Sequence, residues 1–178
     1  MNFISLVGIL GSLILVGGAL TSPDKKGPSG ISLKDWVFGA GNISMLVYSL
    51  MMYFEYSGPV FFVFLTSLTV LASLLVWCKI PQKIAVTLLS IATAGLIYWS
   101  FQLFTRPFEY LFLLGLLVLA YGSVNSKPSH LKNGLLTLGS AALTVFSFLI
   151  GDMIFAGLNF FFALFSGYYW VKGLRDNK

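Results

Sequence analysis

The chain has 178 residues, of which 57% are hydrophobic and only 10% are charged, and its mean hydropathy is +0.89. A soluble domain of this size carries far more polar surface, so the composition excludes an ordinary globular protein and predicts a membrane protein. The net charge of +5 would suggest a nucleic-acid partner in a soluble protein, but basic loops beside a membrane account for it, and we expect no nucleic-acid binding.

Seven stretches are apolar enough, and about long enough, to cross the hydrocarbon core of a bilayer, which takes about 20 helical residues. In chain order they are approximately residues 2–20, 36–54, 58–78, 84–104, 108–123, 134–150 and 153–172. We expect the first stretch to be a retained helix, because no basic residue precedes it as in a secretory signal. All six prolines lie in or next to the connections between stretches. The sequence therefore predicts an all-α, polytopic membrane protein with seven transmembrane helices.

The basic residues give these seven spans an orientation, because Lys and Arg collect in cytoplasmic loops. Of the 11 Lys and Arg residues, Arg106 alone falls on the side of the amino terminus. We therefore place the amino terminus outside and the carboxyl terminus in the cytoplasm. Anionic membrane lipids are the expected partners of the basic side.

Two parts of the sequence resemble each other. Residues 32–49 read SLKDWVFGAGNISMLVYS, and residues 130–147 read HLKNGLLTLGSAALTVFS. The stretches that follow them also match, because residues 58–79 and 151–172 share, among others, Trp77 and Trp170. A weaker match joins residues 3–10 to residues 110–117. In this order the first three helices correspond to the last three.

These matches predict two three-helix repeats that cross the membrane in the same direction. A three-helix unit ends on the side opposite its start, so a parallel second copy needs one extra crossing, which the fourth span supplies. We expect a first bundle over residues 1–79, a linker helix over residues 80–107, and a second bundle with a short cytoplasmic tail over residues 108–178.

This three-plus-one-plus-three plan resembles that of the SWEET sugar transporters and the PnuC vitamin transporters, whose repeat also occurs in SemiSWEET and PQ-loop proteins. The aromatic content and the GYYW sequence at residues 167–170 are more similar to PnuC. The chain differs from the SWEET and PQ-loop patterns in its lack of prolines within helices, and its PQ dipeptide at residues 81–82 falls in a predicted loop. The resemblance implies a facilitator in a bacterial inner membrane that moves a B-vitamin precursor nucleoside by alternating access between two bundles, and it leaves a homo-oligomer open.

Polar residues deep in the repeat helices are the candidate substrate-binding residues, because polar groups are costly in hydrocarbon and tend to face a bundle interior or a pathway. Each of four repeat helices carries two of them, seven residues or roughly 10 Å apart along one face. They are Asn42, Ser49, Thr66, Ser73, Ser140, Ser147, Asn159 and Ser166. Tyr48 joins them as a ring that would stack on a flat solute.

Helix packing is the alternative role for every one of these residues, because small polar side chains let membrane helices approach closely and hydrogen-bond. In the resembling families an asparagine of the third repeat helix contacts substrate. The resemblance implies that role for Asn159, whose counterpart in the first repeat is Thr66.

No residue pattern predicts catalysis, a bound cofactor or a metal. The chain has one histidine, His130, in a predicted loop, and one cysteine, Cys78, which leaves no internal disulfide and no site made of cysteines. A glycine-rich phosphate loop and an acidic pair within the membrane are also missing. We therefore expect a transporter, not an enzyme, for a small polar or heteroaromatic solute. A noncatalytic membrane scaffold or assembly protein is the alternative, and a lipid-modifying enzyme lacks the ionisable residues that it would need.

Overall fold

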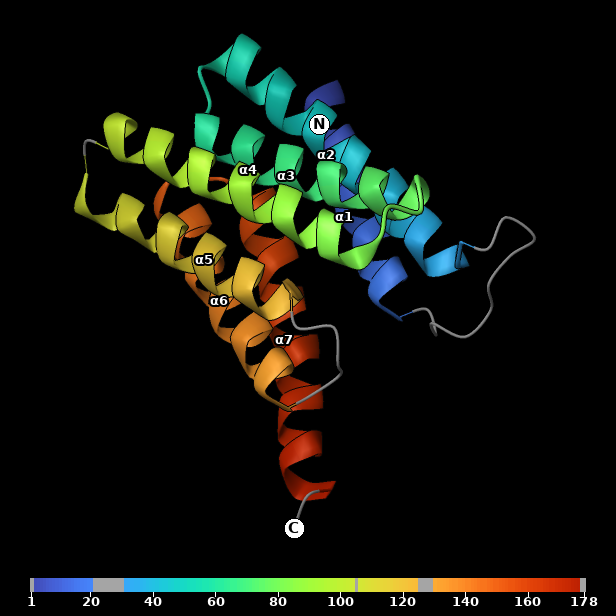
Figure 1. The fold of residues 1–178 in the computed structure, drawn as a ribbon. Helices are drawn as coiled ribbons and strands as arrows, with labels where there is room; N and C mark the ends of the chain where they lie inside the picture. The colour runs from blue at the N-terminus through green and yellow to red at the C-terminus, as the bar shows by residue number, and fades with distance from the viewer. Residues whose placement is uncertain (1, 21–30, 105, 125–129, 177–178) are drawn as a thin grey trace. The chain divides into compact units, whose positions relative to one another are not determined.

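The computed structural model describes residues 2–20, 31–104, 106–124 and 130–176. Over these residues the protein is all-α, with seven α-helices and one 3₁₀-helix, η1 (Pro107–Glu109), which precedes α5 (Figure 1). The α-helices are α1 (Phe3–Leu20), α2 (Leu33–Tyr56), α3 (Val60–Trp77), α4 (Gln82–Leu103), α5 (Tyr110–Val124), α6 (His130–Leu149) and α7 (Met153–Asp176). The predicted number and order of helices are confirmed.

Four helices, α2, α3, α4 and α7, are long and apolar enough to cross a membrane. Shorter apolar helical stretches run over Phe3–Gly18 and Pro107–Leu119. Large apolar side chains such as Phe54 and Ile91 are exposed along the helices, which is unfavourable in water and expected where lipid surrounds the protein. These features indicate an integral membrane protein.

Acidic side chains cap two of the helices. The backbone N–H of Asp35 donates to Ser32 Oγ at 3.1 Å, and the backbone N–H of Ser32 donates to Asp35 Oδ2 at 3.3 Å. This capping box starts α2 three residues before the predicted span. At the start of α7, Asp152 Oδ1 accepts hydrogen bonds from the N–H groups of Ile154 and Phe155 at 3.1 and 3.0 Å. Asp152 therefore lies in a turn, as predicted, and also satisfies two end groups of the helix.

α6 begins at His130, which the sequence had placed in a loop. Hydropathy marks only the apolar part of a helix. A helix can continue into a polar first turn outside the hydrocarbon core of the membrane. Among the prolines, Pro59 and Pro81 directly precede α3 and α4, and Pro107 begins η1, as expected. Three others lie outside the described residues: Pro23, Pro28 and Pro128.

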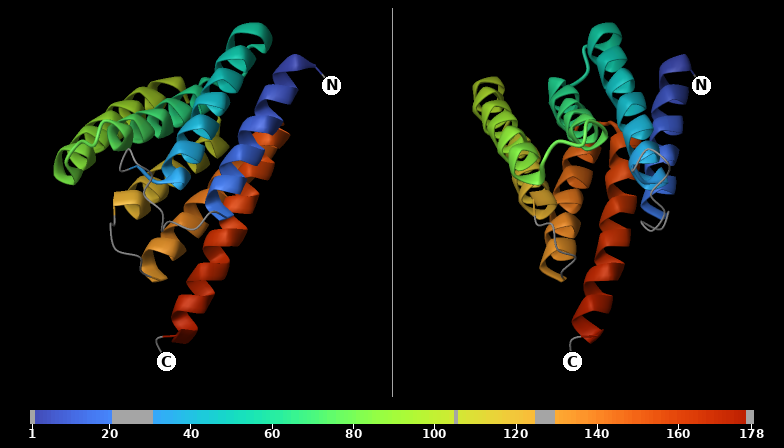
Figure 2. Two further views of the ribbon diagram at one scale, coloured as in Figure 1. Left: turned by 90° about the vertical axis from the view of Figure 1, so that its right-hand side faces the viewer. Right: turned by 45° about the vertical axis from the view of Figure 1, so that its right-hand side comes forward.

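The chain divides into two compact units, Met1–Ala92 (unit 1) and Thr93–Lys178 (unit 2), so the boundary falls inside α4. In unit 1, α2 packs against both α1 and α3. In unit 2, α6 packs in the same way against both α5 and α7 (Figures 1 and 2). The finer division into two bundles and a separate linker over residues 80–107 stays a prediction.

A glycine brings the second helix of each unit close to the first. A Cβ atom at Gly41 of α2 would lie 2.6 Å from Leu15 Cγ of α1, and a Cβ atom at Gly139 of α6 would lie 2.7 Å from Leu119 Cγ of α5. Carbon atoms in real proteins do not approach this closely, so any larger residue would force the helices apart. In each unit, therefore, a leucine of the first helix packs directly against a glycine of the second helix.

Tryptophans fill a similar place between the second and third helices. Trp77 of α3 covers Gly39 of α2, where an added Cβ atom would lie 1.9 Å from Trp77 Cζ2. The Trp77 Nε1–H also donates to the carbonyl oxygen of Asp35 at 3.3 Å, and its ring lies 4.7 Å from that of Trp36. These contacts join the end of α3 to the start of α2.

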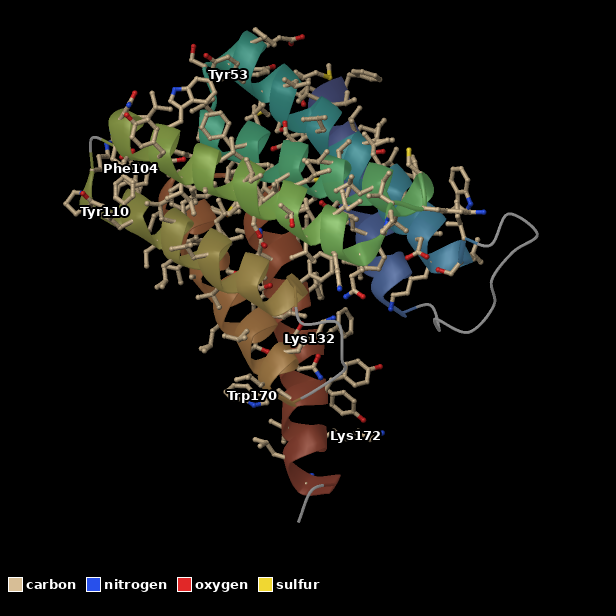
Figure 3. All side chains as sticks on the ribbon, in the orientation of Figure 1. Tyr53, Phe104, Tyr110, Lys132, Trp170 and Lys172 are labelled. Carbon is tan, nitrogen blue, oxygen red and sulfur yellow. The ribbon has the colours of Figure 1, made fainter. Side chains whose placement is uncertain are left out.

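The corresponding tryptophan of unit 2, Trp170, packs at a different level. It covers Gly134 of α6, where an added Cβ atom would lie 2.9 Å from Trp170 Cε2. The residue aligned with Gly39 is Thr137, so unit 2 has no glycine at that position. Figure 3 shows Trp170 toward the same end of unit 2 as Lys132 and Lys172.

Candidate functional site

Asn42 of α2 reaches across to α3. Its Nδ2 donates to Ser73 Oγ at 3.0 Å and to the carbonyl oxygen of Thr69 at 3.4 Å. The Ser73 hydroxyl donates in turn to the carbonyl oxygen of Thr69 at 3.0 Å. The structure therefore joins two of the predicted site residues, Asn42 and Ser73, whereas Asn42 Oδ1 has no partner among the described residues.

Ser49 and Thr66 form a second pair between the same helices. Their hydroxyl oxygens lie 2.8 Å apart, and both residues are buried. Each hydroxyl also lies within hydrogen-bond distance of a carbonyl oxygen of its own helix, Leu46 for Ser49 at 3.0 Å and Phe62 for Thr66 at 2.7 Å. One hydroxyl can therefore donate to the other and still leave both with a partner.

We call Asn42, Ser49, Thr66 and Ser73 the α2–α3 polar set. All four members take part in hydrogen bonds that join α2 to α3. A side-chain hydrogen bond between membrane helices contributes about 0.6 kcal/mol on average and about 1.7 kcal/mol at most. The two levels of the set, two helical turns apart on α2, therefore fix the position of one helix along the other.

The corresponding residues of unit 2, Ser140, Ser147, Asn159 and Ser166, form the α6–α7 polar set. The Ser147 hydroxyl donates to the carbonyl oxygen of Leu143 at 2.7 Å, and Asn159 Nδ2 donates to the carbonyl oxygen of Phe155 at 2.9 Å. Both bonds stay within one helix. Asn159 is only 6% exposed, yet its side-chain carbonyl oxygen and one of its two N–H groups have no partner among the described residues.

Ser140 and Ser166 also lack a bond between the helices. Ser140 is 3% exposed and Ser166 is half-buried. Among the residues that the structure describes, neither hydroxyl has a hydrogen-bond partner, and the bond from Thr144 Oγ1 at 2.8 Å reaches only the backbone carbonyl of Ser140. The four members of the α6–α7 polar set are buried or half-buried like their counterparts in unit 1, but they are not joined across the helices.

Tyr48, the aromatic candidate, is buried on α2 next to Ser49. Its counterpart in unit 2 is Phe146, which is also buried and lies 5.4 Å from the ring of Phe112. The proposed stacking of Tyr48 on a solute stays a prediction.

Ser100 is a polar residue that the sequence reasoning missed. It is 0% exposed, and its fully enclosed hydroxyl oxygen has no hydrogen-bond partner among the described residues. It lies in the part of α4 that belongs to unit 2. In the sequence it is a serine between two aromatic residues in an apolar stretch. This stretch lies outside the two predicted repeats, so the comparison of aligned positions does not include it.

Buried acidic side chains lie at helix ends, where backbone N–H groups donate hydrogen bonds to them. Glu109 Oε2 accepts from the backbone N–H of Arg106 at 2.9 Å, and Asp152 caps α7. Over the described residues no three His, Cys, Asp or Glu side chains gather in a group that could hold a metal ion. The absence of an enzyme activity stays a prediction.

No family model matches the chain, and neither a curated protein nor a solved structure matches it. Its class as an all-α integral membrane protein is indicated by its own helices.

Proposed function

We propose that the protein is a membrane transporter, a facilitator for a small polar or heteroaromatic solute. The observation that supports this most is Asn159, a buried amide in an apolar helix that keeps a donor and an acceptor without a partner among the described residues. A buried polar group left unpaired costs about 1–3 kcal/mol. Such a group is expected where water or a solute meets it. The resemblance to PnuC implies a B-vitamin precursor nucleoside as the solute.

We further infer that the two units contain copies of one three-helix repeat. The glycine–leucine contact between the first two helices is present in each unit, and a second contact supports the same alignment. An added Cβ atom at Gly11 would lie 3.1 Å from Met45 Sδ, and one at Gly115 would lie 2.7 Å from Leu143 Cγ. Met45 and Leu143 are aligned in the sequence. These contacts pair Gly11 with Gly115, whereas the match of residues 3–10 to residues 110–117 pairs Gly8 with Gly115.

The membrane arrangement is part of the same proposal. With seven crossings the amino terminus is outside, the carboxyl terminus is in the cytoplasm, and α4 supplies the crossing that lets the second repeat run parallel to the first. Transport proceeds by alternating access, and the membrane is a bacterial inner membrane. The absence of a charged residue from both polar sets favours facilitated diffusion over coupling to an ion.

Reconstitution tests the function directly. The purified protein in liposomes should take up at least one of four tritiated probes, thiamine, nicotinamide riboside, uridine and glucose, with saturation. Asn159→Leu should reduce that uptake at least about tenfold, because leucine offers neither a donor nor an acceptor. A folded, monodisperse preparation that moves none of these classes of solute would contradict the proposal.

A noncatalytic scaffold or assembly protein is the second candidate, and the α2–α3 polar set favours it. All four of its side chains serve contacts between helices, which is what a purely structural protein would need throughout. This candidate expects Asn159→Leu to leave the protein's cellular role unchanged.

A further inference from the structure

The two polar sets have the same spacing and similar burial, but they differ in what they bond to. We propose that the α6–α7 polar set is the solute-contacting and water-accessible set, and that the α2–α3 polar set holds α2 and α3 together without touching the solute. This division of roles rests on the proposed transport function and adds to it the residues that recognise the solute.

In unit 1 each member of the polar set already bonds to the facing helix, and only Asn42 Oδ1 has no partner among the described residues. Both bonds of Asn42 Nδ2 end on α3, at Ser73 Oγ and at the backbone of Thr69. Ser49 and Thr66 each touch the other's hydroxyl and a carbonyl oxygen. A solute would have to displace these bonds, and each displacement would separate α2 from α3 at that level. The hydrogen bonds gained with the solute would therefore be offset by the bonds lost between α2 and α3.

In unit 2 the corresponding groups still have hydrogen-bonding capacity. Asn159 keeps one N–H donor and its carbonyl acceptor, because among the described residues its side chain bonds only to the carbonyl oxygen of Phe155. Ser140 is 3% exposed and its hydroxyl has no partner among the described residues. The Ser147 hydroxyl donates to its own helix and can still accept. A solute entering here would gain hydrogen bonds without breaking any between helices.

The composition of the α6–α7 polar set indicates the kind of group it binds. Its members are one amide and three hydroxyls, and it holds no ionisable side chain. A charged group among them would lack a counter-charge, which is costly away from water. The amide presents a donor beside an acceptor. The set therefore suits a neutral part of a solute that carries neighbouring donors and acceptors, such as hydroxyl or amide groups.

Thiol labelling tests the division without knowledge of the solute. The background is Cys78→Ser, which removes the one native cysteine, itself exposed. Ser166→Cys and Ser73→Cys form a matched pair, because both serines are half-buried and occupy aligned positions. Ser140→Cys and Ser49→Cys form a second pair, at 3% and 2% exposure. The probe is the charged reagent 2-(trimethylammonium)ethyl methanethiosulfonate, applied to the full protein in liposomes.

We expect the unit 2 cysteine of each pair to react about tenfold faster or more, because a thiol ionises and reacts only where water reaches it. Equal rates within both pairs, or faster reaction at Ser73→Cys or Ser49→Cys, would overturn the division. Circular dichroism and elution as a single species confirm that each variant is folded. Should Ser140→Cys or Ser49→Cys fail this check, the half-buried pair decides the result.

Uptake of the same four tritiated probes separates this inference from the transport function. Asn159→Leu should reduce uptake at least about tenfold, the effect of losing about 1.4 kcal/mol of binding. Asn42→Leu should keep the wild-type KM and lower only thermal stability. Uptake that survives Asn159→Leu but is lost in Asn42→Leu would refute the division and leave the transporter standing. No uptake of any probe by the wild-type protein would refute the transporter, whatever the labelling result.

Discussion

The second and third helices of unit 1 and of unit 2 carry small polar residues at the same spacing, yet over the described parts of the chain only those of unit 1 bond across to each other. The positions of the amides differ. Asn42 lies on the second helix and reaches the facing Ser73 and Thr69, whereas Asn159 lies on the third helix and bonds back to Phe155 on its own helix. The comparison teaches that spacing along a helix places polar groups on one face, but that the residue opposite decides whether they serve packing or stay available.

Overpacking at the tryptophan contacts should give the largest difference between the units in the loss of stability. Gly39→Ala would place a Cβ atom 1.9 Å from the Trp77 ring, whereas Gly134→Ala would place one 2.9 Å from that of Trp170. We expect Gly39→Ala to lower the free energy of unfolding by about 1–3 kcal/mol and Gly134→Ala to lower it by less. Titration with a denaturing detergent measures both.

Gly17→Ala is the control for these two substitutions, because a Cβ atom there would meet nothing within 4 Å. It should leave stability unchanged or raise it by up to about 1 kcal/mol through helix propensity. A Gly39→Ala protein as stable as this control would show that Trp77 does not depend on the glycine.

Replacing the two amides should give the next largest difference in stability between the units. Asn42→Leu deletes a bond between helices and should lower the free energy of unfolding by about 1 kcal/mol, within the range measured for such bonds. Asn159→Leu replaces a partly unsatisfied buried amide and should leave stability unchanged or raise it. Thermal unfolding of the two variants under the same conditions checks the order, and a larger loss for Asn159→Leu would contradict the comparison.

The aligned serines Ser49 and Ser147 should show a smaller difference in stability between the two units. Ser49→Ala removes a partner of Thr66 and should cost about 0.6 kcal/mol, the average for a hydrogen bond between membrane helices. Ser147→Ala removes only a bond to the carbonyl oxygen of Leu143 in its own helix, so its effect should be smaller. The same detergent titration compares them, and equal losses would remove the distinction at this level.

Ser100→Ala should give the smallest effect, and in the opposite direction. The Ser100 hydroxyl is buried without a partner, so its removal should leave the free energy of unfolding unchanged or raise it by about 0.5 kcal/mol. A clear loss of stability or of uptake would show instead that this hydroxyl has a partner in the working protein, such as water or the solute.

Much of the fold could be predicted from runs of apolar residues. The seven helices follow the seven predicted stretches because a long apolar run favours a helix, which satisfies its own backbone groups within the segment. The helix ends were harder to place. α2 starts at Leu33 because of the Ser32–Asp35 capping box, and α6 starts at His130 in a polar turn that hydropathy overlooks.

The candidate site was only half predictable. Helical periodicity correctly placed Asn42 and Ser49 on one face of α2, since both meet α3. It could not tell that the aligned residues of unit 2 would remain unjoined, nor that Ser100 would be buried without a partner. Those outcomes depend on what lies opposite each residue, and no pattern within a single helix contains that information.

The amino-acid sequence by itself determined the class of this protein and the number of its helices, because the hydrocarbon core demands about 20 apolar residues for each crossing. Only the tertiary structure decided the partner of each polar side chain. A hydrogen bond requires two atoms within about 3 Å of each other. Whether two helices meet that closely depends on contacts between them, such as Leu15 on Gly41 and Trp77 on Gly39.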